Sequence, residues 1–85
     1  MRLILYSKPG CHLCEGLQEK LEQIQSLNFE LEIRDITTRN DWFNAYQYEV
    51  PILYIADDMG NEQPIPRPSP RTSVLQLEQM LRKYL

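Results

Sequence analysis

The fold is decided by the stretch Lys8-Pro9-Gly10-Cys11-His12-Leu13-Cys14, which holds both cysteines of the chain. An apolar run precedes this stretch and a long amphipathic segment follows it, which is typical of a strand, a tight turn and the first turn of a helix. Residues i and i+3 of an α-helix lie on one face, about 5–6 Å apart, and a disulfide requires a separation in this range. The spacing therefore predicts a dithiol that opens and closes with little movement of the backbone.

The first cysteine of the pair lies at the predicted entrance of the helix. Unpaired backbone N–H groups and the positive end of the helix dipole favour a thiolate over a thiol at this point. We therefore predict that Cys11 and Cys14 form a redox-active dithiol. A structural disulfide is a weaker interpretation, because the loop that it would close is too short to stabilise the chain much through entropy.

The composition of the chain argues against several classes of function. With 85 residues, of which 42% are hydrophobic, the chain is expected to form one domain over residues 1–85 and to fold without stabilising disulfides or metal ions. Its net charge of −3 and the lack of a basic run argue against nucleic acid as a partner, and no apolar stretch reaches the length of a membrane span. The apolar N-terminal run is too short for a signal peptide. We expect a soluble cytoplasmic protein, where two close cysteines are catalytic or metal-binding more often than structural.

The residues around the cysteines leave alternatives open. Tetrahedral zinc needs four ligands and the chain offers two cysteines and one histidine, so we expect no metal site within one chain. His12 either stabilises the thiolate of Cys11 or is a solvated ring, and we favour the solvated ring. Leu13 is either a substrate contact or the first core position of the helix, and we favour the core. Lys8 is equally consistent with a lysine that guides substrates and with an ordinary surface lysine.

Hydrophobic periodicity divides the chain into four strands and three helices. The strands are expected at residues 3–6, 29–34, 51–55 and 62–65, and the helices at residues 11–26, 39–47 and from Pro70 to the C-terminus. The second strand alternates apolar and charged residues, which indicates a half-buried strand at the edge of a sheet. We expect Trp42, Phe43 and Tyr46 to point inward from the second helix, and Ser69 to cap the third.

The order of these elements, β-α-β-α-β-β-α, predicts the fold class α/β. Strand and helix alternate over residues 1–56, which favours parallel pairing through right-handed crossovers. The last two strands are joined by a turn and form a hairpin. We therefore expect a four-stranded mixed sheet with helices on both faces.

A CxxC pair at a strand-to-helix turn, followed by Val50-Pro51 at the start of a later strand, resembles the thioredoxin fold. The length of the chain, its first strand and Lys8 three residues before Cys11 look most like glutaredoxins, and more narrowly like the short glutaredoxin-like proteins of bacteria. This resemblance implies that Cys11 is the nucleophile of a thiol–disulfide exchange and that Cys14 resolves the mixed disulfide.

The same resemblance implies roles for the residues around the dithiol. Pro51 would be a cis-proline packed beside the cysteines, and Val50 would offer its backbone N–H and C=O to an extended substrate. Lys8 would attract the thiolate or a carboxylate of glutathione. Together with His12 and Leu13, these residues form the candidate substrate-binding set.

The sequence departs from the glutaredoxin pattern at three places. His12 and Leu13 stand where a proline and an aromatic residue are usual, and Glu49 stands where threonine is common. The glycine pair and acidic residue that bind glutathione are replaced by the segment Pro66–Arg71, whose arginines we interpret as solvated rather than as an anion site.

The resemblance also implies the partners. We expect a monomer without a tightly bound cofactor that exchanges with protein or small-molecule disulfides, using glutathione or a thioredoxin-reductase-type donor as its source of electrons. The alternative, from a different class of function, is a thioredoxin-fold binding module or an iron–sulfur carrier in which Cys11 is a ligand.

Overall fold

The computed structural model describes residues 1–85 and contains the four predicted strands and three predicted helices. In chain order the elements are β1 (Arg2–Ser7), α1 (His12–Glu22), β2 (Glu30–Asp35), the short 3-10 helix η1 (Ile36–Thr38), α2 (Asn40–Tyr46), β3 (Ile52–Ala56), β4 (Glu62–Ile65) and α3 (Val74–Leu81). The α/β class and the order of strands and helices are confirmed, and η1 is an addition. No helix is both long enough and apolar enough to cross a lipid bilayer.

The strands form one mixed sheet in the order β2-β1-β3-β4, with β2 at an edge as predicted. β1 pairs in parallel with β2, whereas β3 runs antiparallel to β1 and β4 antiparallel to β3. The parallel pairing predicted through residue 56 is therefore wrong for β3. The seven residues of α2 rise about 10 Å, about half the length of the six-residue strand β2, so α2 does not carry the chain back to the start of that strand. The chain therefore enters β3 from the end where it left β2.

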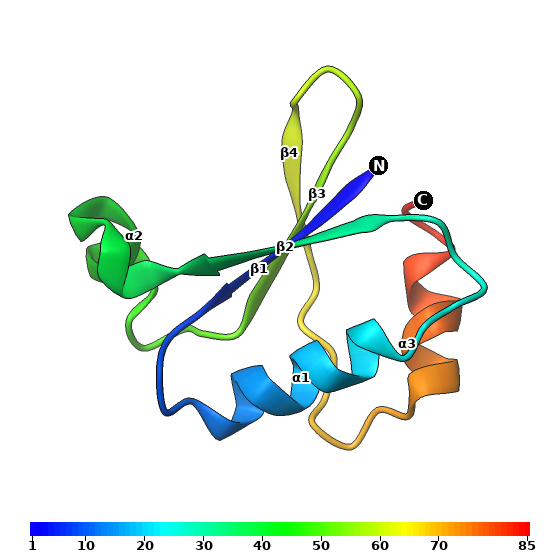
Figure 1. The fold of residues 1–85 in the computed structure, drawn as a ribbon, viewed down its shortest axis with the longest axis horizontal. Helices are drawn as coiled ribbons and strands as arrows, with labels where there is room; N and C mark the ends of the chain where they lie inside the picture. Colours follow the sequence, from blue (N-terminus) through cyan, green and yellow to red (C-terminus); the bar gives the residue numbers. More distant parts are fainter.

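Helices cover both faces of the sheet, as predicted. α1 and α3 lie together on one face, and α2 lies apart from them at one end of the other (Figure 1). The larger core lies under α1 and α3 and consists of Leu3, Leu5, Leu17, Leu21, Ile24, Leu53, Ile55, Ile65, Leu77 and Leu81. The smaller core lies on the opposite face and consists of Ile4, Tyr6, Ile36 and Ala56. Alternate residues of β1 serve the two cores, which explains why its whole apolar run is buried.

α1 ends at Glu22, earlier than the predicted Ser26. The backbone tightens there, because the N–H groups of Gln23 and Ile24 donate to carbonyls three residues earlier, each at 3.2 Å. Ile24 lies just beyond the helix and is still buried in the larger core. The apolar spacing that predicted a longer helix therefore reports burial correctly but not the helical conformation of the last residues.

α3 is capped by Ser73, so the prediction that Ser69 caps it is wrong. The backbone N–H of Gln76 donates to the hydroxyl of Ser73 at 3.1 Å, and the N–H of Ser73 donates to the side-chain oxygen of Gln76 at 3.0 Å, which together make a capping box. Ser69 belongs to a turn in the connector between β4 and α3, where its carbonyl accepts from the N–H of Thr72 at 2.9 Å.

α2 covers its face of the sheet with two aromatic side chains. Trp42 and Tyr46 pack on Tyr6 of β1, with ring centroids 5.6 Å and 4.7 Å from that of Tyr6. Phe43 is 38% exposed, so the prediction that it points inward is wrong. It follows Trp42 about 100° further around the helix, and α2 contacts the smaller core on the side of Trp42 and Tyr46.

Candidate active site

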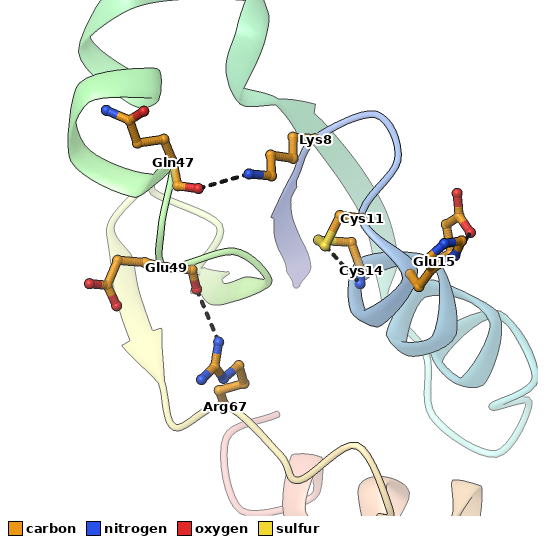
Figure 2. Close-up of a disulfide and its surroundings, with 8 residues drawn as sticks. Lys8, Cys11, Cys14, Glu15, Gln47, Glu49 and Arg67 are labelled. Atoms are coloured by element: carbon orange, nitrogen blue, oxygen red, sulfur yellow. Dashed lines mark hydrogen bonds and ion pairs between the residues drawn. A yellow bond between two sulfur atoms is a disulfide. The ribbon is translucent and has the colours of Figure 1, made fainter.

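Cys11 and Cys14 are joined by a disulfide at the N-terminus of α1 (Figure 2). Their Cα atoms are 5.2 Å apart, as their spacing predicted. Cys11 is the N-cap residue of the helix, and its sulfur accepts a hydrogen bond of 3.2 Å from the backbone N–H of Cys14. The N-terminus of the helix therefore provides a hydrogen-bond donor to the sulfur of Cys11. Such a donor favours the thiolate form of this cysteine.

The two cysteines differ in exposure. Cys14 is 2% exposed and belongs to the buried face of α1, whereas Cys11 is half-buried. An attacking sulfur must reach its substrate, while a resolving sulfur needs only to reach its neighbour. The difference in burial therefore suits Cys11 to meet a substrate and Cys14 to act from behind it.

The turn before α1 depends on Gly10. Its φ is +78°, a conformation that residues with a side chain rarely adopt. The turn is closed by the N–H of Cys11, which donates to the carbonyl of Lys8 at 3.3 Å. This geometry ends β1 and places Cys11 at the helix entrance.

The peptide bond between Val50 and Pro51 is cis, as the resemblance implied, and Pro51 is buried. The N–H of Val50 donates to the carbonyl of Tyr46 at 3.1 Å, so the prediction that this N–H is offered to a substrate is wrong. The last carbonyls of a helix lack partners within the helix, and here the chain after α2 folds back to supply one. The carbonyl of Val50 accepts no hydrogen bond from the backbone.

A groove runs between α1 and the connector that follows β4. It has a volume of about 320 Å³, and its lining includes His12 and Leu13 from between the cysteines, Pro51, and residues 67–70. The structure therefore brings the CxxC segment and the cis-proline to one groove. By resemblance, the sequence set Pro66–Arg71 in place of the residues that bind glutathione, and residues 67–70 line this groove.

Two cations hold the segment that precedes Pro51. The ammonium of Lys8 donates to the carbonyl of Gln47 at 3.0 Å, and Nη1 of Arg67 donates to the carbonyl of Glu49 at 3.1 Å (Figure 2). In Figure 2 the side chain of Lys8 extends toward Gln47 rather than toward the cysteines. Lys8 and Arg67 thus support the loop beside the disulfide, a role that the sequence did not reveal because each contact joins residues far apart in the chain. A role of Lys8 toward a thiolate or a carboxylate stays a prediction.

The two residues between the cysteines point outward. The side chain of His12 is 94% exposed, and its Nδ1 lies 3.5 Å from a carboxylate oxygen of Glu15, as expected of a solvated ring. Leu13 is 53% exposed, so the interpretation of Leu13 as a core residue is wrong. Its spacing from Leu17 fits the buried stripe of the helix, but Leu13 borders the groove and is not part of the larger core. No group of three or more His, Cys, Asp or Glu side chains is arranged to hold a metal ion.

Tyr46, whose carbonyl anchors the loop before Pro51, carries no charge at neutral pH. Its hydroxyl lies 3.5 Å from that of Tyr54, and this hydrogen bond together with burial raises the pKa of Tyr46 to about 12. The charges close to the loop are those of Lys8 and Arg67, together with the carboxylate of Glu49 within the loop.

A comparison with protein families identifies the family of the chain. The family model described as a Glutaredoxin-like domain matches residues 2–82. No curated protein matches the chain.

Three solved structures are similar to the chain over most of its length. The X-ray structure of the structural genomics target protein XcR50 from X. campestris is 30% identical, with a TM-score of 0.61, and the match covers 95% of this chain and 96% of that one. A solution structure of the same X. campestris protein is 33% identical, with a TM-score of 0.51 and coverage of 93% and 92%. Thioredoxin 1 from Thermosipho africanus is 16% identical, with a TM-score of 0.68 and coverage of 99% and 93%, and this match concerns the fold alone.

Proposed function

The chain belongs to the glutaredoxin-like family and has the thioredoxin fold, and from this premise we propose that it is a thiol–disulfide oxidoreductase. Cys11 is the nucleophile and Cys14 the resolving cysteine. The observation that carries the proposal is the disulfide at the entrance of α1, in which the half-buried sulfur accepts the N–H of Cys14 and the other sulfur lies buried behind it.

The reaction starts from the reduced dithiol. The thiolate of Cys11 attacks one sulfur of a substrate disulfide, the S–S bond of the substrate breaks, and the departing thiolate takes a proton from solvent. Cys14 then loses its proton and attacks the sulfur of Cys11 in the mixed disulfide, which releases the second substrate thiol. Two electrons pass from the protein to the substrate, and the protein is left with the Cys11–Cys14 disulfide.

The surroundings of Cys11 support its role as nucleophile. The N–H of Cys14 points at the sulfur, and a donor of this kind binds a thiolate more strongly than a thiol. Because the two Cα atoms are held at 5.2 Å by one helical turn, the second attack needs little rearrangement of the backbone. The groove that contains Leu13 and Pro51 leads away from the cysteines and gives the substrate a surface to bind.

The proposed substrates are protein or small-molecule disulfides. The oxidised protein is returned to the dithiol by a thiol donor, either glutathione or a reductase of the thioredoxin-reductase type. The donor decides whether the cycle passes through a mixed disulfide with glutathione, so the two donors are compared directly in the experiment below.

The experiment measures reduction of hydroxyethyl disulfide by the wild type, Cys11→Ser and Cys14→Ser, once with glutathione and glutathione reductase and once with thioredoxin reductase. We expect turnover by the wild type with at least one donor and none by Cys11→Ser. In the arm without glutathione, Cys14→Ser should accumulate a mixed disulfide on Cys11, which mass spectrometry detects under non-reducing conditions, because the variant lacks the resolving thiol.

Three results would contradict the proposal. The first is retained activity of Cys11→Ser, which would remove the nucleophile. The second is full turnover of Cys14→Ser with glutathione, which would replace the dithiol route by a monothiol one. The third is alkylation of Cys11 by iodoacetamide at neutral pH no faster than alkylation of a free cysteine.

A further inference from the structure

The groove beside the disulfide differs in charge from the molecule as a whole. The chain has a net charge of −3, yet Lys20 and Arg67 line the groove and no aspartate or glutamate does. Both cations are held at its walls, because Nζ of Lys20 donates to the carbonyl of Pro70 at 2.7 Å and Nη1 of Arg67 donates to that of Glu49 at 3.1 Å. Each of these contacts uses one donor, so both cations keep further N–H groups for another acceptor.

Gly16 forms part of the wall of this groove, in the middle of α1. Glycine destabilises the interior of a helix relative to alanine, so its presence there calls for a reason. Packing does not supply one, because a Cβ atom at this position would meet no atom within 4 Å. The missing side chain leaves that space to the groove.

We infer that the groove binds an acidic, extended segment of a disulfide-bearing protein, and that it selects substrates with carboxylates close to the disulfide. This inference rests on the proposed disulfide exchange and adds the class of substrate. Lys20 and Arg67 supply the positive charge, Gly16 supplies room for the segment, and the exposed side chain of Leu13 supplies an apolar contact beside the cysteines.

The distance from Cys11 to Lys20 indicates where the carboxylates of such a segment lie. Lys20 comes nine positions after Cys11 in the chain, which is about 13 Å along the axis of α1. An extended chain covers that distance in about four residues. The groove therefore suits aspartate or glutamate within about four residues of the cysteine that Cys11 attacks.

The charges also distinguish a protein segment from glutathione. Glutathione has a free α-ammonium group besides its two carboxylates, and this groove offers two cations and no carboxylate to bind an ammonium. A segment inside a polypeptide has no free amino group. An acidic protein segment therefore complements the lining better than glutathione does.

The test uses three peptides, each with one cysteine in a mixed disulfide with 2-mercaptoethanol. At the third and fourth positions on both sides of the cysteine they carry glutamate, glutamine or lysine. The rate at which the reduced protein releases 2-mercaptoethanol or peptide is followed by acid quenching and mass spectrometry, and hydroxyethyl disulfide and glutathione disulfide are measured alongside. We expect the acidic peptide to react about fivefold faster than the neutral one and the basic peptide to be slowest, with the differences shrinking in 0.5 M salt.

Variants test whether the preference for the acidic peptide arises in the groove. Lys20→Gln combined with Arg67→Gln should abolish the preference for the acidic peptide, and Gly16→Leu should slow all three peptides by filling the space. The peptide rates of each variant are divided by its own rate with hydroxyethyl disulfide, which is too short to reach from Cys11 to Lys20, so that any general effect on the dithiol cancels. Lys83→Gln, an exposed charge near the C-terminus, and Glu19→Leu, on the exposed face of α1, are the matched controls and should behave as the wild type.

The outcomes separate the two proposals. If the wild type fails to reduce even hydroxyethyl disulfide, disulfide exchange itself is wrong. If hydroxyethyl disulfide is reduced but the three peptides react equally, exchange stands and acidic selection is overturned. If glutathione disulfide reacts faster than the acidic peptide, and the double variant removes that advantage, the groove serves a small ligand and the inferred protein segment is overturned.

Discussion

Gly10 and Gly16 lie six residues apart, on either side of the CxxC pair, and the backbone uses them in different ways. Gly10 has a φ of +78° and makes the turn that brings Cys11 to the helix entrance. Gly16 lies within α1 and has open space around its missing Cβ atom. The stability of the protein should therefore respond in opposite directions to the same substitution at the two positions.

Gly10→Ala should lower the free energy of unfolding by about 1–2 kcal/mol, because an alanine is strained at positive φ. Gly16→Ala should raise it by about 0.5–1 kcal/mol, because alanine favours the helix and its methyl group meets no atom. Urea unfolding of the oxidised proteins measures both. A loss of stability in Gly16→Ala would mean that the fold itself requires glycine at this position. The absence of a side chain there could then no longer be attributed to the groove.

Residues of the site were predictable from the sequence only where their relation is local. The disulfide between Cys11 and Cys14 follows from a spacing of three on a helix, and both residues of this pair were identified. The contacts of Lys8 with Gln47 and of Arg67 with Glu49 join positions 39 and 18 residues apart, and no local pattern encodes them. The exposure of Leu13 was missed for a related reason, because it depends on where the neighbouring elements end.

At the scale of elements, Ser69 and Ser73 both precede α3, and only Ser73 caps the helix. Ser73→Ala should destabilise the protein by about 1 kcal/mol, because it removes the acceptor for the N–H of Gln76 from the capping box. Ser69→Ala should cost less, because its hydroxyl accepts only from the N–H of Arg71 in an exposed turn. Thermal and urea unfolding compare the two variants. A larger loss for Ser69→Ala would show that the connector, rather than the helix cap, controls the docking of α3.

The turn between β3 and β4 should make stability depend on pH. The carboxylate of Asp57 accepts from the N–H of Asn61 and of Met59, each at 2.9 Å, and these hydrogen bonds, that of Asn61 first, lower its pKa below the usual value. A carboxyl group whose pKa is lowered by folding adds stability above its unfolded pKa, near 3.9, and loses it as the pH falls. Asp57→Ala should therefore be less stable than the wild type at pH 7, and the difference should narrow at pH 3.

Urea midpoints at the two pH values measure this change. Asp58→Ala is the matched control, because the Asp58 carboxylate lies 3.7 Å from the N-terminal ammonium with its side chain 96% exposed. It should change stability less than Asp57→Ala at pH 7. An effect of Asp57→Ala that is the same at pH 7 and pH 3 would show that the charge of the carboxylate is not what stabilises the turn.

The elements themselves were largely predictable, and the direction of one strand was not. Periods of two and of three to four residues identified the strands and helices, because the burial of one face repeats with the geometry of the backbone. The direction of β3 depends instead on where the chain emerges from η1 and α2. That position is set by packing of Trp42 and Tyr46 on Tyr6, a contact between elements that no single segment reveals.

At the scale of the whole molecule, one arginine links the two edges of the sheet. Arg34 lies on β2 at one edge and Glu62 on β4 at the other, and their side chains meet above the smaller core with two hydrogen bonds of 3.1 Å and 3.0 Å. Arg34 also donates to the hydroxyl of Tyr6 at 2.7 Å, and its guanidinium lies 5.5 Å from the ring centroid of Trp42. α2 covers only one end of this face. The ion pair of Arg34 and Glu62 covers the remaining part of the smaller core, above Ile4 and Ala56. The sequence predicted β2 as a half-buried edge strand with one charged face, and Arg34 on that face contributes to this cover.

This cover should contribute to the stability of the sheet. In a double-mutant cycle, Arg34→Ala and Glu62→Ala should show a coupling of about 1–2 kcal/mol, because the pair is bidentate and the side chain of Arg34 is only 16% exposed. The matched control is the pair Arg39 and Asp41, which is also bidentate, at 3.0 Å and 2.9 Å, but 58% and 62% exposed. Its coupling should be clearly smaller, because solvent screens an exposed pair. Urea unfolding of the wild type and the six variants gives both couplings. If the couplings are equal, burial of Arg34 adds nothing, and the smaller core must be held by its apolar and aromatic contacts alone.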